Sequence, residues 1–433
     1  MERRWTVKIK PQIYSGMLLM MFFCDDVFAA VVEGIFGSSL VTPLYYLIFF
    51  VLLSLTIIVK KNKGSLAVPF WVYFFVFLLF LFTALIHPEY DEWFSHSVYG
   101  IIPAFLSPRA GIWAFLIVWL VSDEDLYIFV KYTAFILFLF GSLQFALVSI
   151  RGYWIIQDVE GTLRHDRYSL EYGYDMLLPV AFFGAEWLLR SKKIYFIPYI
   201  LGAFMIFSNG SRGAVVWTVI MFLMILPFKW KKIGSKKKVW FVLILMVLSI
   251  VVVPICMNYH IILSRLSAIF MRYGISSRTL LSLMEGSFSD GNGREQIYAL
   301  AIDLIKTGGL FGHGVYGDRY TIGNYFRWGY SHNIFLEFFV SFGYIGGIAA
   351  SLFLVTGILR LYRHCNTWKR QIVFITFLIT SCKLILSNSF WYTPGFWALL
   401  ALIIKWGKRY RLRICKGTKT IGMKLDQSVS INI

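Results

Sequence analysis

Long apolar runs without charged residues constrain this chain more than any other feature of its sequence. Leu40–Val59, Leu66–Ile86 and Val239–Ile255 each approach or exceed the roughly 20 residues that a helix needs to cross a bilayer. The chain of 433 residues is 58% hydrophobic and only 15% charged, whereas soluble domains carry about 25% charged residues. The sequence therefore predicts an all-α polytopic membrane protein. It excludes a soluble enzyme, a nucleic-acid-binding domain and a disulfide scaffold.

The apolar segments predict about twelve membrane spans. These lie at about 13–31, 40–59, 66–86, 99–121, 127–149, 174–190, 193–208, 213–228, 239–257, 331–359, 371–387 and 393–406. The fourth contains Pro103, Pro108 and Arg109, so it could be a broken or re-entrant helix. The chain then divides into spans one to nine (1–257), a large outer loop (258–330), spans ten to twelve (331–406) and a basic tail (407–433).

The 42 Lys and Arg residues, which give a formal net charge of +19, orient these spans. Most of them fall into clusters, including residues 3–10, 60–63, 229–238 and 405–424, that share one side of the membrane. Because cytoplasmic loops are enriched in Lys and Arg, we expect both termini to lie in the cytoplasm. The 258–330 loop then lies on the outer face.

That outer loop contains two helical patterns. Apolar residues recur at helical spacing at Ile262, Leu266, Ile269, Phe270 and Tyr273, which predicts an amphipathic helix on the membrane surface. A second helix is predicted over Arg294–Lys306, between a run of turn residues and Gly308-Gly309. A long loop with its own helices is more often functional than a plain connector.

Three residues on the outer face could carry chemistry: Arg212, Arg294 and His332. Two guanidinium groups could hold a diphosphate through paired hydrogen bonds, and an imidazole can accept a hydroxyl proton near neutral pH. Each residue also has a plain structural interpretation. They could be a snorkelling arginine, a solvated loop arginine and an interfacial histidine.

Two further motifs have a weaker connection to function. Gly312–Gly317 fits the dinucleotide pattern G-x-G-x-x-G, but no βαβ context surrounds it, so we expect a tight turn that approaches a ligand or the membrane. Glu89 and Asp91 could hold a divalent metal, although a solvated acidic loop explains them better. None of the five cysteines has the spacing of a metal site.

Taken together, Ser211-Arg212-Gly213, Gly293-Arg294, the glycine-rich turn at 308–317 and His332-Asn333-x-x-Leu336 followed by Gly343 resemble one family. It is the O-antigen polymerase and O-antigen ligase superfamily, and the resemblance is strongest over 193–350. The resemblance implies a helical membrane glycosyltransferase related to the GT-C class. Such enzymes use undecaprenyl-diphosphate-linked glycans on the outer face of the bacterial inner membrane.

By resemblance, Arg212 and Arg294 match the arginines that hold the donor diphosphate, and His332 matches the histidine that activates the acceptor hydroxyl. Further candidate contacts to the substrate are Asn333, His313, Tyr298 and Arg164. Tyr298 stands where many members have tryptophan. The resemblance also implies an inverting reaction that needs no metal and no other cofactor.

Three functions remain open at this point, beside the alternative of a structural membrane subunit without catalysis. A polymerase joins lipid-linked repeat units into O-antigen, capsule or exopolysaccharide, and we favour it because polymerases are the most numerous enzymes of the superfamily. A ligase passes the glycan to lipid A-core or another acceptor. A polysaccharide flippase is the alternative of another class. Besides the donor, the acceptor and membrane lipids, a chain-length regulator and a flippase are candidate partners.

Overall fold

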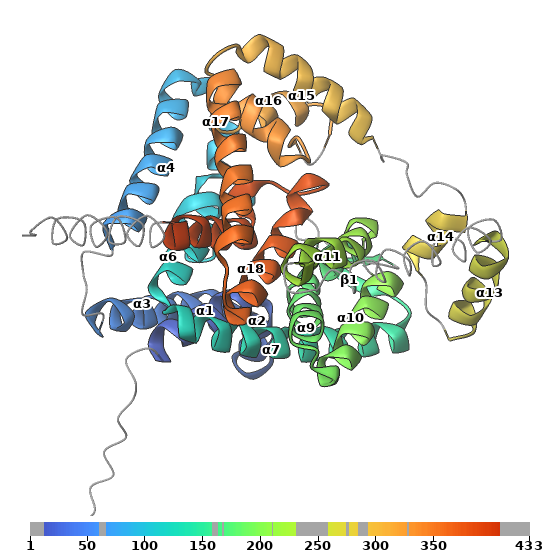
Figure 1. The fold of residues 1–433 in the computed structure, drawn as a ribbon. Coiled ribbons are helices and arrows are strands. Elements are labelled where there is room, and N and C mark those ends of the chain that lie inside the picture. The colour runs from blue at the N-terminus through green and yellow to red at the C-terminus, as the bar shows by residue number, and fades with distance from the viewer. Residues whose placement is uncertain are drawn as a thin grey trace, which may run out of the picture.

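The computed structural model describes residues 13–59, 66–157, 163–166, 169–209, 211–230, 259–273, 277–284, 293–326 and 329–407. Within these ranges the chain is almost entirely helical (Figure 1). The helices are α1 (Ile13–Phe23), α2 (Asp25–Phe36), α3 (Val41–Val59), α4 (Ala67–Ile86), α5 (Asp91–Ser95), α6 (Trp113–Leu120), α7 (Asp123–Arg151), α8 (Leu170–Asp175), α9 (Leu177–Arg190), α10 (Phe196–Asn209), α11 (Arg212–Trp230), α13 (Tyr259–Arg272), α14 (Arg278–Met284), α15 (Arg294–Gly308), α16 (Gly317–Ile322), α17 (Ile334–His364), α18 (Trp368–Ser381) and a final helix at Pro394–Gly407. Short 3-10 or π turns lie at Ser38–Leu40, Pro88–Tyr90, Ile102–Leu106, Lys193–Tyr195, Cys382–Ile385 and Phe390–Tyr392.

Five helices in the described ranges are long and apolar enough to cross a bilayer, and a bent pair would make a sixth. They are α3 with the turn before it, α4, α7, α11 and α17, and the bent pair is α1 with α2. These findings fit a polytopic membrane protein. The count of twelve spans stays a prediction, and its ninth span, 239–257, lies outside the described residues.

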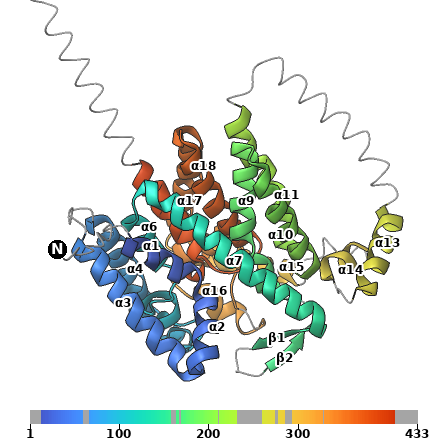
Figure 2. The same cartoon turned by 90° about the horizontal axis from the view of Figure 1, so that it is seen from below.

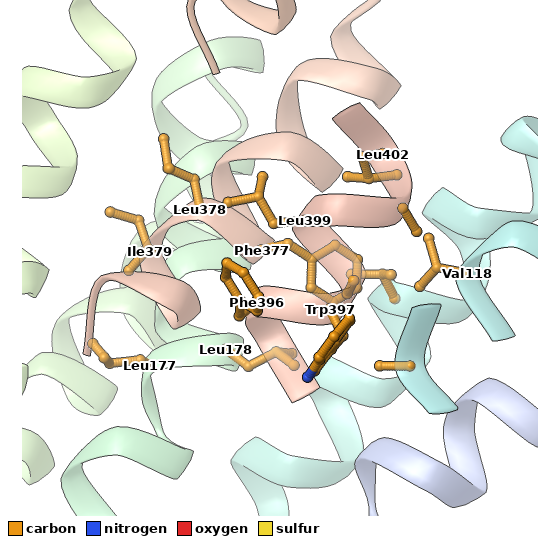
Figure 3. Close-up of a cluster of buried hydrophobic side chains, with 14 of the residues drawn as sticks. Val118, Leu177, Leu178, Phe377, Leu378, Ile379, Phe396, Trp397, Leu399 and Leu402 are labelled. Atoms are coloured by element: carbon orange, nitrogen blue, oxygen red, sulfur yellow. The ribbon is translucent and has the colours of Figure 1, made fainter. Parts of the chain in front are cut away.

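Several predicted spans correspond to shorter helices that are packed inside the bundle. In α9, every residue from Leu177 to Glu186 is buried, as expected for a helix that other helices surround. Figure 3 shows Leu177 and Leu178 of α9 in one buried apolar cluster with Phe377 of α18 and Phe396 of the final helix. This shared cluster packs α9 and α18 together with the final helix.

The first predicted span is not one continuous helix. α1 and α2 meet at Cys24 with a bend of 82°. After the bend, α2 begins at Asp25. Asp25 and Asp26 lie in its first turn, where their carboxylates suit the positive end of the helix dipole. Asp25 also pairs with Arg109 (Oδ2 to Nε, 3.2 Å). This pairing ties the bend to the fourth predicted span, which the structure also breaks, into a π turn at Ile102–Leu106 and α6.

The expectation of an all-α fold misses one small hairpin. β1 (Trp154–Gln157) pairs antiparallel with β2 (Leu163–Asp166), and Ile156 lies opposite Arg164. Figure 2 shows the hairpin beyond the end of α7. A sheet of two four-residue strands leaves little periodicity in the sequence, which explains why apolar patterns alone do not predict it.

Both helices predicted in the outer loop are present. α13 covers the amphipathic segment, and its Phe270 ring packs edge-on against Phe204 of α10 (5.8 Å between centroids). Ile269 and Met271 remain exposed, so the membrane-surface position of α13 stays a prediction. α15 begins at Arg294 as expected and packs along α17.

A kink in α17 at Gly343 (φ 64°) anchors the outer loop to this membrane helix. The glycine-rich turn between α15 and α16 lies against the kink. Four backbone hydrogen bonds join the two, from His313 to Val340 (2.8 Å), Gly314 to Ser341 (3.0 Å), Tyr344 to Gly309 (3.0 Å) and Ile345 to Leu310 (3.2 Å). The predicted close approach of the turn is therefore to the backbone of α17, where a kinked helix leaves peptide groups to be paired.

The junction requires glycine on both sides. A Cβ added at Gly343 would overlap the backbone of Gly312 and Leu310, and a Cβ at Gly312 would overlap Gly343. Both residues also have positive φ, which costs other residues about 1–3 kcal/mol. The loop can therefore come this close to α17 only because both positions lack a side chain.

We expect Gly343→Ala to lower the free energy of unfolding by at least about 2 kcal/mol, because overlap adds to the cost of positive φ. Gly34→Ala is the matched control, since a Cβ there meets nothing within 4 Å in the exposed part of α2. Thermal unfolding in detergent micelles measures both. A Gly343→Ala midpoint equal to that of Gly34→Ala would contradict this account of the junction.

Candidate active site

His332 and Asn333 form the entry to α17. Asn333 is the N-cap, and its Oδ1 accepts hydrogen bonds from the backbone N–H groups of Phe335 (2.9 Å) and Leu336 (3.3 Å). Its Nδ2 donates to the carbonyl of Ile385 (3.2 Å). Asn333 therefore satisfies the free N–H groups of the helix end and ties them to the segment after α18.

His332 itself has a left-handed backbone conformation (φ 52°), which is uncommon for residues other than glycine. Its ring is half-buried and lies against the ring of Tyr330, with 4.1 Å between the centroids. Burial, together with the positive charge of Arg294, lowers the pKa of His332 to about 4. The imidazole is therefore neutral at physiological pH, which is the form that can accept a proton.

Arg294 is the first residue of α15 and follows Gly293, which has φ 81°. Its charge acts on His332 and also on Tyr174 of α8. Tyr298 lies one turn further along α15 and packs with Ile297 against the apolar cluster between α15 and α17. This packing orients the helix whose first residue is Arg294.

Arg212 is the first residue of α11, and its neighbours fix that end of the helix. The Ser211 hydroxyl accepts a hydrogen bond from the N–H of Ala214 (3.2 Å). The Tyr174 hydroxyl interacts with Ser211, and it occupies the space that a Cβ at Gly213 would need. The Ser-Arg-Gly motif thus places Arg212 at the start of a helix, and Tyr174 contacts the residues on either side of it, Ser211 and Gly213.

Ser387 links the start of α11 to the segment that contains His332. It interacts with Tyr174, which contacts the start of α11, and with Tyr330, which lies against His332. The structure therefore brings Arg294 and His332 together and links them, through Tyr174 and Ser387, to the residues that flank Arg212. Two arginines and a neutral histidine in this arrangement can hold an anionic leaving group and accept a proton.

One predicted contact, His313, lies away from this group. His313 lies at the opposite end of α15 from Arg294, about 20 Å along the helix axis, and its Nε2 bonds the Leu304 carbonyl (2.9 Å) and Thr307 (3.1 Å). It closes the last turn of α15. Arg164 lies on β2 opposite Ile156, and its side chain is outside the described part of the structure.

The acidic loop after α4 has a local structure of its own. Glu89 pairs with His87 (Oε1 to Nδ1, 2.8 Å) in a solvent-exposed turn. Within the described ranges, no three His, Cys, Asp or Glu side chains come close enough to share a metal ion.

Sequence reasoning missed three buried charged residues that are linked to the residue before His332, because Asp318 accepts hydrogen bonds from Ser331. Asp318, Arg319 and Glu337 are each at most 1% exposed and form a chain of ion pairs. Glu337 could have been found, because an ionisable residue inside a predicted span is usually functional. Asp318 and Arg319 are in a polar loop, where nothing in the sequence marks them as buried.

A groove of about 480 Å³ lies between α4 and α17. Its walls are almost wholly apolar and include Val72 and Val76 of α4, Phe338 and Phe342 of α17, and Trp397 of the final helix. Phe338 follows Glu337 on α17. Phe390 also lines the groove and donates its backbone N–H to Glu337, so the groove borders the buried ion pairs.

Comparison with known families indicates the class of protein in which these residues occur. Residues 197–351 match the family model described as O-antigen ligase. The match contains Arg212, Arg294 and His332, and it supports the O-antigen ligase and polymerase superfamily for this chain. No curated protein matches the sequence. The match supports a ligase or polymerase type of activity on lipid-linked glycans in a bacterial membrane.

We expect Asn333→Ala to lower the free energy of unfolding by about 1–2 kcal/mol, because the start of α17 loses its cap. Asn333→Asp keeps the capping oxygen and should lose less. Asn324→Ala is the control, since its amide makes one exposed bond to the Tyr320 carbonyl. Thermal unfolding in detergent measures all three. An Asn333→Ala midpoint equal to that of Asn324→Ala would refute the capping role.

Proposed function

We propose that this chain is a membrane glycosyltransferase that polymerises undecaprenyl-diphosphate-linked repeat units into a surface polysaccharide. One observation carries the proposal most strongly. Arg294 stands at a helix start beside His332, a half-buried neutral histidine, and both lie in the segment that matches the O-antigen ligase family. A fixed cation beside a proton acceptor suits the transfer of a glycan from a diphosphate.

In this proposal Arg212 and Arg294 bind the donor diphosphate. Each is the first residue of a helix, α11 and α15, where backbone N–H groups also favour an anion. Guanidinium groups bind phosphate oxygens through short charge-assisted hydrogen bonds, which are roughly twice as strong as neutral ones. The same groups stabilise the negative charge that develops on the diphosphate as it leaves.

His332 is the general base. Its neutral imidazole takes the proton of the acceptor hydroxyl while that oxygen forms a bond to the anomeric carbon of the donor sugar. The bond between the anomeric carbon and the diphosphate breaks, and the electron pair leaves with the diphosphate. Attack from the face opposite the leaving group inverts the configuration. A positioned base contributes typically about 10²–10⁴ in rate.

The apolar groove between α4 and α17 suits the isoprenoid chain of the donor. A hydrocarbon chain needs no polar partners, and the groove offers almost none. We further propose the twelve-span order, with both termini in the cytoplasm and the site on the outer face of the inner membrane. The positive-inside rule supports this orientation. Chain-length regulators and flippases are candidate partners in the same membrane.

We expect a strain that carries His332→Ala in place of the wild-type gene to lose its polysaccharide ladder and to accumulate single lipid-linked repeat units. His87→Ala is the matched control, because His87 lies in an exposed turn, where its ring pairs with Glu89 and stacks on Tyr90. Gel analysis of lipid-linked and surface glycans distinguishes the cases. Full-length lipid-linked chains left unattached would indicate a ligase. An unchanged ladder would refute the role of His332.

The low pKa of His332 gives a second prediction. Above about pH 5 the base is already neutral, so the initial rate should hardly change between pH 5.5 and 7.5. Arg294→Gln removes a positive charge that lowers this pKa. In this variant the pKa of His332 should therefore rise, so that more of the imidazole is protonated at pH 5.5. The rate at pH 5.5 should then fall relative to the rate at pH 7.5. Lys306→Gln, at the far end of α15, is the control. Identical pH profiles for both variants would argue against the electrostatic effect of Arg294 on His332.

A further inference from the structure

The buried ion pairs linked to the residue before His332 start from Asp318 and Arg319, at the beginning of α16. The Arg319 Nη1 lies 2.8 Å from Asp318 Oδ1, and the Arg319 backbone N–H donates to the same oxygen (2.9 Å). The two side chains are 0% and 1% exposed. A carboxylate so far from water must have all of its hydrogen-bonding capacity used, because unpaired buried charge is costly.

The second oxygen of Asp318 is used by the residue before His332. Asp318 Oδ2 accepts hydrogen bonds from the backbone N–H (3.2 Å) and from the hydroxyl (3.1 Å) of Ser331. Ser331 is fully buried. Asp318 therefore fixes both the backbone and the side chain at position 331.

The fixed residue is adjacent to a strained one. His332 has φ 52°, a conformation that costs a residue other than glycine energy and persists only where its surroundings impose it. Asn333 holds the other side through the helix cap and the Ile385 carbonyl. His332 is therefore held between two anchored neighbours, Ser331 and Asn333.

The other end of the ion-pair chain anchors the facing segment. Arg319 Nη2 lies 3.5 Å from Glu337 Oε1, and that carboxylate accepts hydrogen bonds from the Ser389 hydroxyl and the Phe390 backbone N–H (3.3 Å). The neighbouring Ser387 interacts with Tyr330. The same buried charges thus hold both the segment that contains His332 and the segment after α18 that includes Ser389 and Phe390.

We propose that Asp318, held by Arg319, is a positioning residue: through Ser331 it keeps His332 in the left-handed conformation that the transfer reaction requires. This inference rests on the proposed role of His332 as the base. Asp318 touches no substrate and acts only through Ser331. Buried ion pairs are weak contributors to stability, whereas they can select one conformation among several.

The test compares two serine variants of the purified full chain in proteoliposomes, with a polyprenyl-diphosphate-linked repeat unit as donor. Ser331→Ala removes the hydroxyl that bonds Asp318. Ser341→Ala is the matched control, because its hydroxyl is equally buried on α17 and has no hydrogen-bond partner among the described residues. Displacement of a catalytic group by about 1 Å can cost about a hundredfold in rate. We expect kcat of Ser331→Ala to fall about tenfold or more, with the donor KM within twofold of wild type and Ser341→Ala unchanged.

Asp318→Asn is the second variant and should lose at least as much kcat as Ser331→Ala. Wild-type kcat in Ser331→Ala, while His332→Ala is inactive, would overturn the inference and leave the proposed function intact. Equal losses in both serine variants, or loss of cooperative unfolding in Ser331→Ala, would show a general structural role and also overturn it. Full activity of His332→Ala would instead refute the proposed function itself.

Discussion

The ion pair between Asp318 and Arg319 is the interaction on which the arrangement of α16, the start of α17 and the segment after α18 depends. Neither charge has access to water, so each must be paired within the protein, and removing one partner of such a pair typically costs about 3–5 kcal/mol. The partners that complete the pairing, Ser331 and Glu337, lie on the entry to α17 and in its first turn. The outer loop, the start of α17 and the segment after α18 are therefore held as one unit.

The Gly312–Gly343 junction adds a second attachment between the outer loop and the membrane helices. α17 is long enough to cross a bilayer, and its kink lies nine residues after its start. Backbone hydrogen bonds to the glycine-rich turn form at this kink. The polar groups of the bent helix are paired with the loop, as a membrane environment demands of any exposed peptide group. α15, which starts at Arg294, thus has a fixed position relative to the helix that follows His332.

Local sequence patterns predicted the features that depend on interactions between residues close together in the chain, namely the positions and ends of most helices. The apolar runs placed most helices within a few residues, and the breaker run before Arg294 placed the start of α15, because span length and helix termination act over short distances. Proline in the fourth span likewise indicated the break that the structure has. The motifs around Arg212, Arg294 and His332 identified segments that the structure connects through Tyr174 and Ser387.

The features that the sequence did not reveal depend on contacts between distant residues. The 82° bend at Cys24 is fastened by Arg109, more than eighty positions away. As a histidine in the predicted outer loop, His313 is a natural candidate for a substrate contact. Its ring instead bonds the Leu304 carbonyl and closes the last turn of α15. The burial of Asp318 and Arg319 depends on Ser331 and Glu337, and Tyr174 meets Gly213 only in the folded chain. No pattern of spacing along the chain reports such pairings.

The central claim is that Arg212 and Arg294 form a diphosphate site next to a base that takes no part in holding the diphosphate. Binding of polyprenyl diphosphate and polyprenyl monophosphate to the chain in lipid nanodiscs tests it most directly. We predict that wild type and His332→Ala bind the diphosphate at least about tenfold more tightly than the monophosphate, because each arginine adds charge-assisted hydrogen bonds. Arg294→Gln should lose most of this preference. Equal preference in wild type and Arg294→Gln, or its loss in His332→Ala alone, would contradict the account.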